Sequence, residues 1–195
     1  MDPLSIRVDR TNRIVAVGGP WDEIALVNGG DAAIVERVLG TGLLDHVHGD
    51  PARMLVLTVL DRVRRFGAPR SVPYRCDTPG LKRWMEMTLT PAPDGTVTFE
   101  HRLLRSEPMQ RPVRFALARP GTARGPAIIR CSSCNRVRDA SGWHEPDAVR
   151  FSAEAAGTPT GSAETGTPPG PDAPILVGYG VCDACRARIE RLLAG

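Results

Sequence analysis

Two Cys-x-x-Cys pairs constrain this chain more than any other feature of its sequence. They are Cys131/Cys134 and Cys182/Cys185, with 47 residues between them. Zinc binds four thiolates at the corners of a tetrahedron, about 2.3 Å from each sulfur, and one such turn can direct two sulfurs into a single site. The pattern therefore predicts a structural Zn²⁺ held by these four cysteines, with no open position for catalysis.

The same four cysteines leave other chemistries open. An iron–sulfur cluster, reversible dithiol chemistry and disulfides all use paired cysteines. Asn135 and Arg186 stand where a c-type haem attachment motif needs histidine, so that class is excluded. The spacing between the pairs is longer than in an ordinary zinc ribbon, and residues 152–173 account for most of the excess. A longer flexible loop costs little, about 0.6 kcal/mol for each doubling of its length.

Basic residues gather around the first cysteine pair. The whole chain has a net charge of +3, yet residues 111–151 alone carry eight arginines against three acidic side chains. Four thiolates around Zn²⁺ leave a formal charge near −2, which neighbouring arginines can offset. Those that flank the cysteines are Arg130, Arg136, Arg138, Arg186 and Arg188. Contact with nucleic-acid phosphates is the alternative interpretation of the same excess.

The sequence also carries expectations about location. No stretch reaches about 18 uninterrupted apolar residues, so no membrane-spanning helix is expected. The first residues lack a basic region followed by an apolar one, so we expect no secretory signal and a cytoplasmic protein. Disulfides are rare in that compartment, which favours metal binding for the paired cysteines.

Residues 4–105 predict one α+β domain. Its helices are expected at residues 21–27 and 50–66, the second with Asp50 as N-cap, Pro51 in the first turn and Gly67 as the stop. Strands are expected at residues 6–9, 13–17, 70–76, 81–90 and 96–104. Strands, then helices, then a three-stranded meander predict an antiparallel sheet with helices on one face.

The rest of the chain has a different composition. Residues 108–126 are rich in Pro, Arg and Gly and predict a linker, with one extended segment at 113–118. Residues 152–173 are too polar to bury a core, so we expect a disordered insert there. Residues 183–193 place Ile189, Leu192 and Leu193 on one helical face.

Several short motifs in the first domain resemble bacterial PAS-domain signalling proteins. They are Ile14-Val15-Ala16-Val17 followed by Trp21, Val38-Leu39-Gly40, Asp45, Gly49-Asp50 and Tyr74-Arg75-Cys76-Asp77. The resemblance covers roughly residues 4–105. It implies a PAS-like sensory domain at 1–107, and PAS domains commonly form homodimers.

The tail is similar to a cysteine module found after PAS or receiver domains. Its motifs are Cys131-Ser132-Ser133-Cys134-Asn135-Arg136-Val137-Arg138, Gly142-Trp143 and Gly180-Val181-Cys182-Asp183-Ala184-Cys185. This chain departs by its insert, by Asn135 where lysine is common and by Tyr179 where histidine is common. The resemblance implies a zinc-ribbon-like module at 127–195, with the linker at 108–126 before it.

These features together predict a non-catalytic sensory, signalling or protein-interaction protein. We find no nucleophile–base pair and no open metal site, so no enzyme is expected. A homodimer and a signalling protein are the expected partners, with nucleic acid as an alternative and no membrane. A nucleic-acid-binding transcriptional regulator and a thiol redox switch that releases zinc remain rival functions. The ligand of the PAS pocket is not predicted.

Other candidate residues have simpler interpretations. We expect Cys76 to be a small buried strand residue, and His101 to lie on an exposed strand face. His46 and His48 are expected in a solvated loop. His144 follows Trp143 near the cysteines, and we expect the tryptophan to cap the metal module rather than the histidine to replace a ligand.

Overall fold

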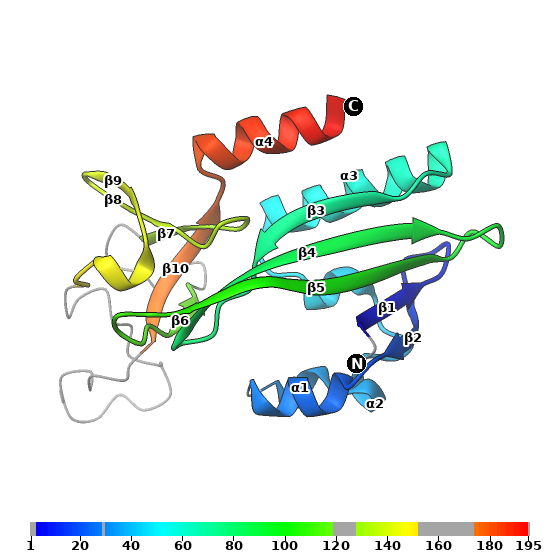
Figure 1. Ribbon diagram of the computed structural model, residues 1–195, viewed down its shortest axis with the longest axis horizontal. Coiled ribbons are helices and arrows are strands. Elements are labelled where there is room, and N and C mark those ends of the chain that lie inside the picture. The colour runs from blue at the N-terminus through cyan, green and yellow to red at the C-terminus, as the bar shows by residue number, and fades with distance from the viewer. Residues whose placement is uncertain (1–2, 29, 119–127, 152–173, 195) are drawn as a thin grey trace.

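The computed structural model describes residues 3–28, 30–118, 128–151 and 174–194. They form two five-stranded sheets that lie side by side, with helices packed around the first (Figure 1). None of the helices in these ranges is long and apolar enough to cross a membrane.

The first sheet is antiparallel throughout, with strand order β2-β1-β5-β4-β3. Its strands are β1 (Leu4–Val8), β2 (Ile14–Gly18), β3 (Arg70–Arg75), β4 (Leu81–Pro91) and β5 (Val97–Pro108). The predicted hairpin between β4 and β5 turns at Gly95, whose φ of 84° suits glycine. Asp94 fixes this turn, because its Oδ1 accepts the Thr96 backbone N–H at 2.9 Å.

The helices of this region lie between β2 and β3 in the chain. They are α1 (Trp21–Val27), α2 (Val35–Val38) and α3 (Asp50–Phe66), with 3₁₀ turns η1 (Asp31–Ala33) and η2 (Leu43–His46). α3 ends at Gly67 in the left-handed conformation, as predicted. The predicted cap is wrong by one residue: Gly49 is the N-cap and Asp50 is already helical, because Gly49 alone tolerates the φ of 86° found there.

One hydrophobic core joins the helices to one face of the first sheet. α3 contributes Val59, Leu60 and Val63, each at most 3% exposed. The other buried members come from the strands and the short helices: Val8, Ile14, Val38, Leu43, Val72, Met87, Leu89, Val97 and Phe99. Alternate strand residues supply this face, as the period of a β-strand requires. The predicted fold class, α+β with an antiparallel sheet, is confirmed.

The second sheet is mixed and has the order β6-β10-β7-β8-β9. Its strands are β6 (Phe115–Leu117), β7 (Ile128–Cys131), β8 (Val137–Asp139), β9 (Gly142–His144) and β10 (Ile175–Gly180), and the 3₁₀ turn η3 (Pro146–Ala148) follows β9. β10 runs parallel to both β6 and β7, whereas β7, β8 and β9 are antiparallel. β6 lies inside the predicted extended segment, while residues 119–127 and the predicted disordered insert 152–173 fall outside the described residues.

The final helix, α4 (Asp183–Ala194), starts beside the second sheet and ends against the first. Leu192 and Leu193 pack against the core of the first sheet. The Arg62 guanidinium donates a hydrogen bond to the Leu193 carbonyl oxygen, which the end of the helix leaves without an intrahelical donor. This helix therefore connects the second sheet to α3.

Candidate metal centre

The four predicted ligands lie together. The Sγ atoms of Cys131, Cys134, Cys182 and Cys185 are all within 4.8 Å of one another, and those of Cys134 and Cys182 are 3.7 Å apart. Four sulfurs at about 2.3 Å from one zinc, at tetrahedral angles, stand about 3.8 Å apart. The cluster therefore has the dimensions of a tetrathiolate metal site, although its residues come from opposite ends of a long sequence gap.

The first cysteine loop is a tight turn at the end of β7. The Asn135 N–H donates to the Cys131 carbonyl at 3.0 Å, and the Cys131 N–H donates to the Arg136 carbonyl at 2.8 Å. Asn135 has a φ of 61°, a left-handed conformation that asparagine adopts more readily than most residues. Asparagine is therefore well suited to this position of the turn.

The second loop is placed by the pairing of β10 with β7. Gly180 lies opposite Cys131 in the parallel register, so the two cysteine loops leave the sheet at the same end. A Cβ atom at Gly180 would stand 2.9 Å from Cγ2 of Ile129, which explains the glycine at this close approach. The Cys182 backbone N–H then donates to the Cys131 sulfur at 3.4 Å, and α4 begins at the next residue.

Burial around the cluster is uneven. Cys131 is 0% exposed, Cys182 4% and Cys185 5%, whereas Cys134 is half-buried. Trp143 and Val181 pack against these cysteines, so the predicted capping role of Trp143 is confirmed. A shielded set of soft ligands suits a metal ion whose task is structural.

The protonation of Cys131, Cys134 and Cys185 is linked. Hydrogen bonding from Cys134, and next from Cys185, lowers the pKa of the Cys131 thiol. The hydrogen bond that Cys134 makes with Cys131 raises the pKa of the Cys134 thiol. The hydrogen bond that Cys185 makes with Cys131 raises the pKa of the Cys185 thiol to about 11. Without a cation the site stabilises the Cys131 thiolate at the expense of those of Cys134 and Cys185. A divalent, thiophilic metal fits the donor set because it would hold all four sulfurs ionised.

The arginines expected to offset the thiolates are mostly engaged elsewhere. Arg188 meets the expectation: its Nη2 lies 3.8 Å from the Cys185 sulfur and donates to Ser133 Oγ at 2.6 Å. Arg136 pairs with Glu145, while Arg138 and Arg130 lie over the rings of Trp143 and Phe115. Arg188 is thus the arginine that contacts a cysteine sulfur of the cluster, while the charge of Arg136 also interacts with Cys134 and Cys182.

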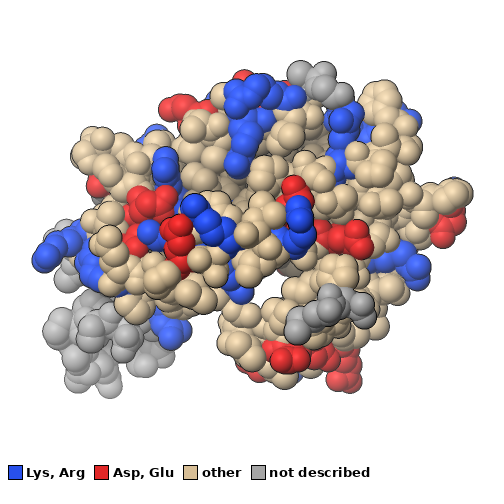
Figure 2. Space-filling view, in the orientation of Figure 1, with Lys and Arg blue, Asp and Glu red and all other residues tan. Residues whose placement is uncertain are grey.

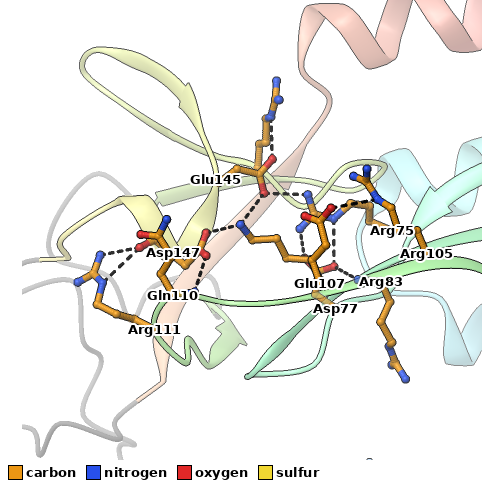
Figure 3. A network of polar contacts seen from close by, with 11 residues as sticks. Arg75, Asp77, Arg83, Arg105, Glu107, Gln110, Arg111, Glu145 and Asp147 are labelled. Atoms are coloured by element: carbon orange, nitrogen blue, oxygen red, sulfur yellow. Dashed lines mark hydrogen bonds and ion pairs between the residues drawn. The ribbon is translucent and has the colours of Figure 1, made fainter.

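A network of ion pairs centred on Arg75 connects the first sheet to the first cysteine loop and to Glu145 beside η3 (Figure 3). The Arg75 side chain is 4% exposed and binds both carboxylate oxygens of Asp77, at 3.0 and 2.6 Å, and one of Glu145 at 2.8 Å. Its guanidinium also lies 4.7 Å from the centre of the Trp84 ring. Arg75 also contacts the first cysteine loop through its backbone, because its N–H donates to the carbonyl of Ser133 at 3.0 Å.

The far side of the network consists of Lys82 and the residues around η3. Lys82 Nζ lies 2.8 Å from Asp147 Oδ1 and 3.9 Å from Glu145 Oε2. Burial alone would raise the pKa of Glu145, but the hydrogen bond from Arg75 and the charge behind it keep that pKa below its usual value. Asp147 also accepts the Gln110 backbone N–H at 2.9 Å. The carboxylates are therefore held ionised between cations of both sheets.

Sequence reasoning found the cysteines and missed this network. Arg75 and Asp77 belong to one of the motifs that resemble PAS domains, and in the structure they pair with each other. Glu145 and Asp147 drew no attention, because acidic residues beside a turn are common. One signal was available: Lys82 is the single lysine in a chain of arginines, and a compact ammonium suits a position between two carboxylates.

Two other expectations are wrong. Cys76 is exposed, because β3 ends one residue earlier and its backbone turns to pair with Arg83. His101 is half-buried on the helix side of the sheet, where Nδ1 lies 2.9 Å from the Tyr74 hydroxyl, and burial lowers its pKa to about 4.

The remaining histidines lie outside the cluster. His46 and His48 are exposed, as expected. His144 Nε2 lies 3.2 Å from Asp139 Oδ1 and is not part of the sulfur cluster.

Comparison with known proteins gives structural likeness alone. No family model matches the chain, and no curated protein matches it. Two solved structures each match 52% of this chain with a TM-score of 0.37. One is a domain of an HTR-like protein from Haloarcula marismortui, which is 15% identical and covered over 97% of its length. The other is Cycle PAS-B from Drosophila melanogaster with bound ethylene glycol, which is 13% identical and covered over 99% of its length. The PAS domain of nitrogen regulation protein NR(II) from Vibrio parahaemolyticus (16% identity, 88% of that chain) matches 52% with a TM-score of 0.36. These identities and TM-scores describe partial similarity of fold. The assignment of the metal site therefore depends on the geometry of the four cysteines alone.

Proposed function

We propose that this chain is a non-catalytic PAS-type sensory or protein-interaction protein, stabilised by one structural Zn²⁺ bound to Cys131, Cys134, Cys182 and Cys185. The observation that carries the metal assignment is the cluster of four Sγ atoms within 4.8 Å. Four thiolates fill a tetrahedral zinc shell and leave no position for water or substrate. The metal then acts through folding, and its binding free energy is folding free energy.

The signalling part of the proposal is supported by the contact between the two sheets. Arg75, at the end of β3, donates to the first cysteine loop through its backbone and to Glu145 through its side chain. A change in the first sheet, whether from a bound ligand or a partner, would therefore act directly on the first cysteine loop. We expect the protein to transmit its signal by binding to a signalling partner. We also expect it to form a homodimer through the PAS-like domain and to act in the cytoplasm.

Metal analysis tests the proposal first. The full chain, purified under reducing conditions without added metal, should contain one zinc per molecule and show no visible absorbance. Cys182→Ser should lose the zinc, while the matched variant Cys76→Ser, at the exposed cysteine outside the cluster, should keep it. Visible absorbance would indicate an iron–sulfur cluster, and an absence of metal in the wild type would contradict the structural-zinc assignment.

A nucleic-acid-binding regulator remains the rival function, and one observation favours it. Figure 2 shows basic side chains gathered over α4, where Arg186 and Arg191 are exposed. A duplex of mixed sequence should then bind with an affinity that falls steeply with salt, and Arg186→Ala with Arg191→Ala should weaken it. Binding that is weak at low salt and unaffected by these changes would remove the rival.

A further inference from the structure

The half-buried ligand, Cys134, lies at an open cleft. The cleft has a volume of about 500 Å³ and runs between the outer face of the first sheet and the two cysteine loops. Trp84 and Arg105 line one wall, and Cys134, Cys185 and Arg188 line the other. A small molecule in this cleft therefore reaches the metal centre from one side, and Cys134 is the ligand with the most exposed surface.

A second cysteine lies close enough to react with an oxidised Cys134. The Cys182 sulfur lies 3.7 Å from the Cys134 sulfur and belongs to the other loop. A disulfide has a sulfur–sulfur length of about 2.05 Å, so bond formation needs an approach of less than about 2 Å. A disulfide between these two residues would join the loops while removing two ligands from the metal.

We propose that Cys134 is the site at which peroxide oxidises this centre, and that Cys182 resolves the product into a Cys134–Cys182 disulfide with release of the metal. This inference rests on the proposed zinc site and adds its point of chemical attack. It assigns unequal roles to four ligands that the sequence pattern makes equivalent.

Hydrogen peroxide is the oxidant, and the reaction has two steps. The Cys134 sulfur attacks one peroxide oxygen: an S–O bond forms, the O–O bond breaks, and the leaving hydroxide is protonated to water. The Cys182 thiolate then attacks the Cys134 sulfur: an S–S bond forms, the S–O bond breaks, and a second hydroxide leaves and is protonated. Two electrons pass from the two sulfurs to the peroxide, and a dithiol reductant reverses the result.

The surroundings of both cysteines connect this reaction to the rest of the fold. Ser133, next to Cys134, accepts the Arg75 N–H from the first sheet, and α4 begins immediately after Cys182. Movement of the two sulfurs toward each other therefore pulls on β3 and on α4 together. The exposed Cys76 lies 3.7 Å from Arg83 Nη2 and outside the sulfur cluster, so it serves as an internal control.

The test uses the zinc-loaded full chain and limiting hydrogen peroxide. Released zinc is followed with a colorimetric chelator, and remaining thiols are alkylated before the disulfides are mapped by mass spectrometry. We expect Cys134–Cys182 as the first disulfide, formed as zinc is released, and recovery of zinc binding after dithiothreitol. Cys76→Ser should behave like the wild type. A first disulfide within either Cys-x-x-Cys pair, or oxidation of Cys76 with the zinc retained, would overturn the proposal.

A ligand-conserving variant separates reactivity from loss of the site. Histidine also binds zinc and forms no disulfide, so Cys134→His should retain metal and release it at least about tenfold more slowly under peroxide. Release at the wild-type rate from this variant would contradict the role of Cys134. If the wild type binds no zinc at all, the proposed function fails. If it binds zinc but peroxide does not release it, this inference alone fails.

Discussion

The first sheet and its helices bury twelve apolar side chains in one cluster. The buried cluster at the end of the second sheet consists of three cysteines, and Cys134, Trp143 and Val181 pack beside them. Each fully buried Val, Leu or Phe contributes about 1.5–3 kcal/mol of transfer free energy, so the first region has its own source of stability. The second has much less of this contribution, and a structural zinc contributes an apparent 10–16 kcal/mol or so in small zinc domains. The first region is therefore stabilised by burial of apolar side chains, whereas the second, on the proposed function, depends on its metal.

Removal of the largest core side chain should affect the first region most. Phe99 is 2% exposed in the centre of the first core, so Phe99→Ala should lower the free energy of unfolding by about 3–5 kcal/mol. The zinc content of the folded protein should not change. Urea denaturation and metal analysis of the same preparation check both statements, with Val15→Ala at a 44% exposed position as control. Loss of zinc in the folded variant would mean that the two regions do not have separate sources of stability.

Arg75 tests the contact between the regions. Arg75→Ala leaves Asp77 with a side chain that is 2% exposed and without its cation, a situation that costs about 3–5 kcal/mol. The matched control is Arg102→Ala, whose 2.8 Å pair with Glu86 has an arginine side chain that is 71% exposed and should cost at most about 1 kcal/mol. Hydrogen exchange should show increased opening at both β3 and the first cysteine loop in Arg75→Ala. Opening confined to one of them would contradict the coupling.

The pH dependence of the first region should carry the signature of His101. Its folded-state pKa is about 4, against an ordinary value of 6.5, so the unfolded chain binds a proton in this window and the folded chain does not. Stability should therefore fall as pH is lowered from 6.5 toward 4, by at most about 1.4 kcal/mol per pH unit. His101→Gln, which can still accept from the Tyr74 hydroxyl, should remove this part of the slope in urea titrations at several pH values. An unchanged slope would show that His101 is solvated in the folded state.

The smallest expected effect concerns the end of α4. Leu192 is half-buried against the core of the first sheet, so Leu192→Ala should cost about 1 kcal/mol. The change should appear as faster hydrogen exchange in α4 with the metal bound. Leu104→Ala, at a residue 49% exposed on β5, provides the control. Equal effects of the two substitutions would indicate that α4 is held by the cysteines alone.

The sequence predicted the elements whose determinants are local. The helix at Asp50–Phe66 follows from apolar spacing and its terminal glycine, and the hairpin at Gly95 follows from Asp94 beside it. The cysteine cluster was also predictable, because a metal requires particular residue types at particular spacings. In each case the information lies within a few residues or in a rule of coordination chemistry.

Features that depend on pairing across the chain escaped prediction. The parallel contact of β10 with β7 joins segments separated by the insert, and periodicity cannot specify a partner. The Arg75 network draws on β3, β4 and η3, and each member looks like an ordinary surface charge in sequence. Cys76 and His101 were misplaced because burial depends on where a strand ends and on which face the helices cover.

Hydrogen exchange of the full chain with and without a zinc chelator tests the central claim most directly. After metal removal under reducing conditions, amides of β7, β10 and the first turn of α4 should exchange at rates near those of an unfolded chain. Amides of α3, β4 and β5 should remain protected, except near Arg75. Uniform loss of protection across both sheets, or no change in either, would contradict the account of one region held by its core and another held by its metal.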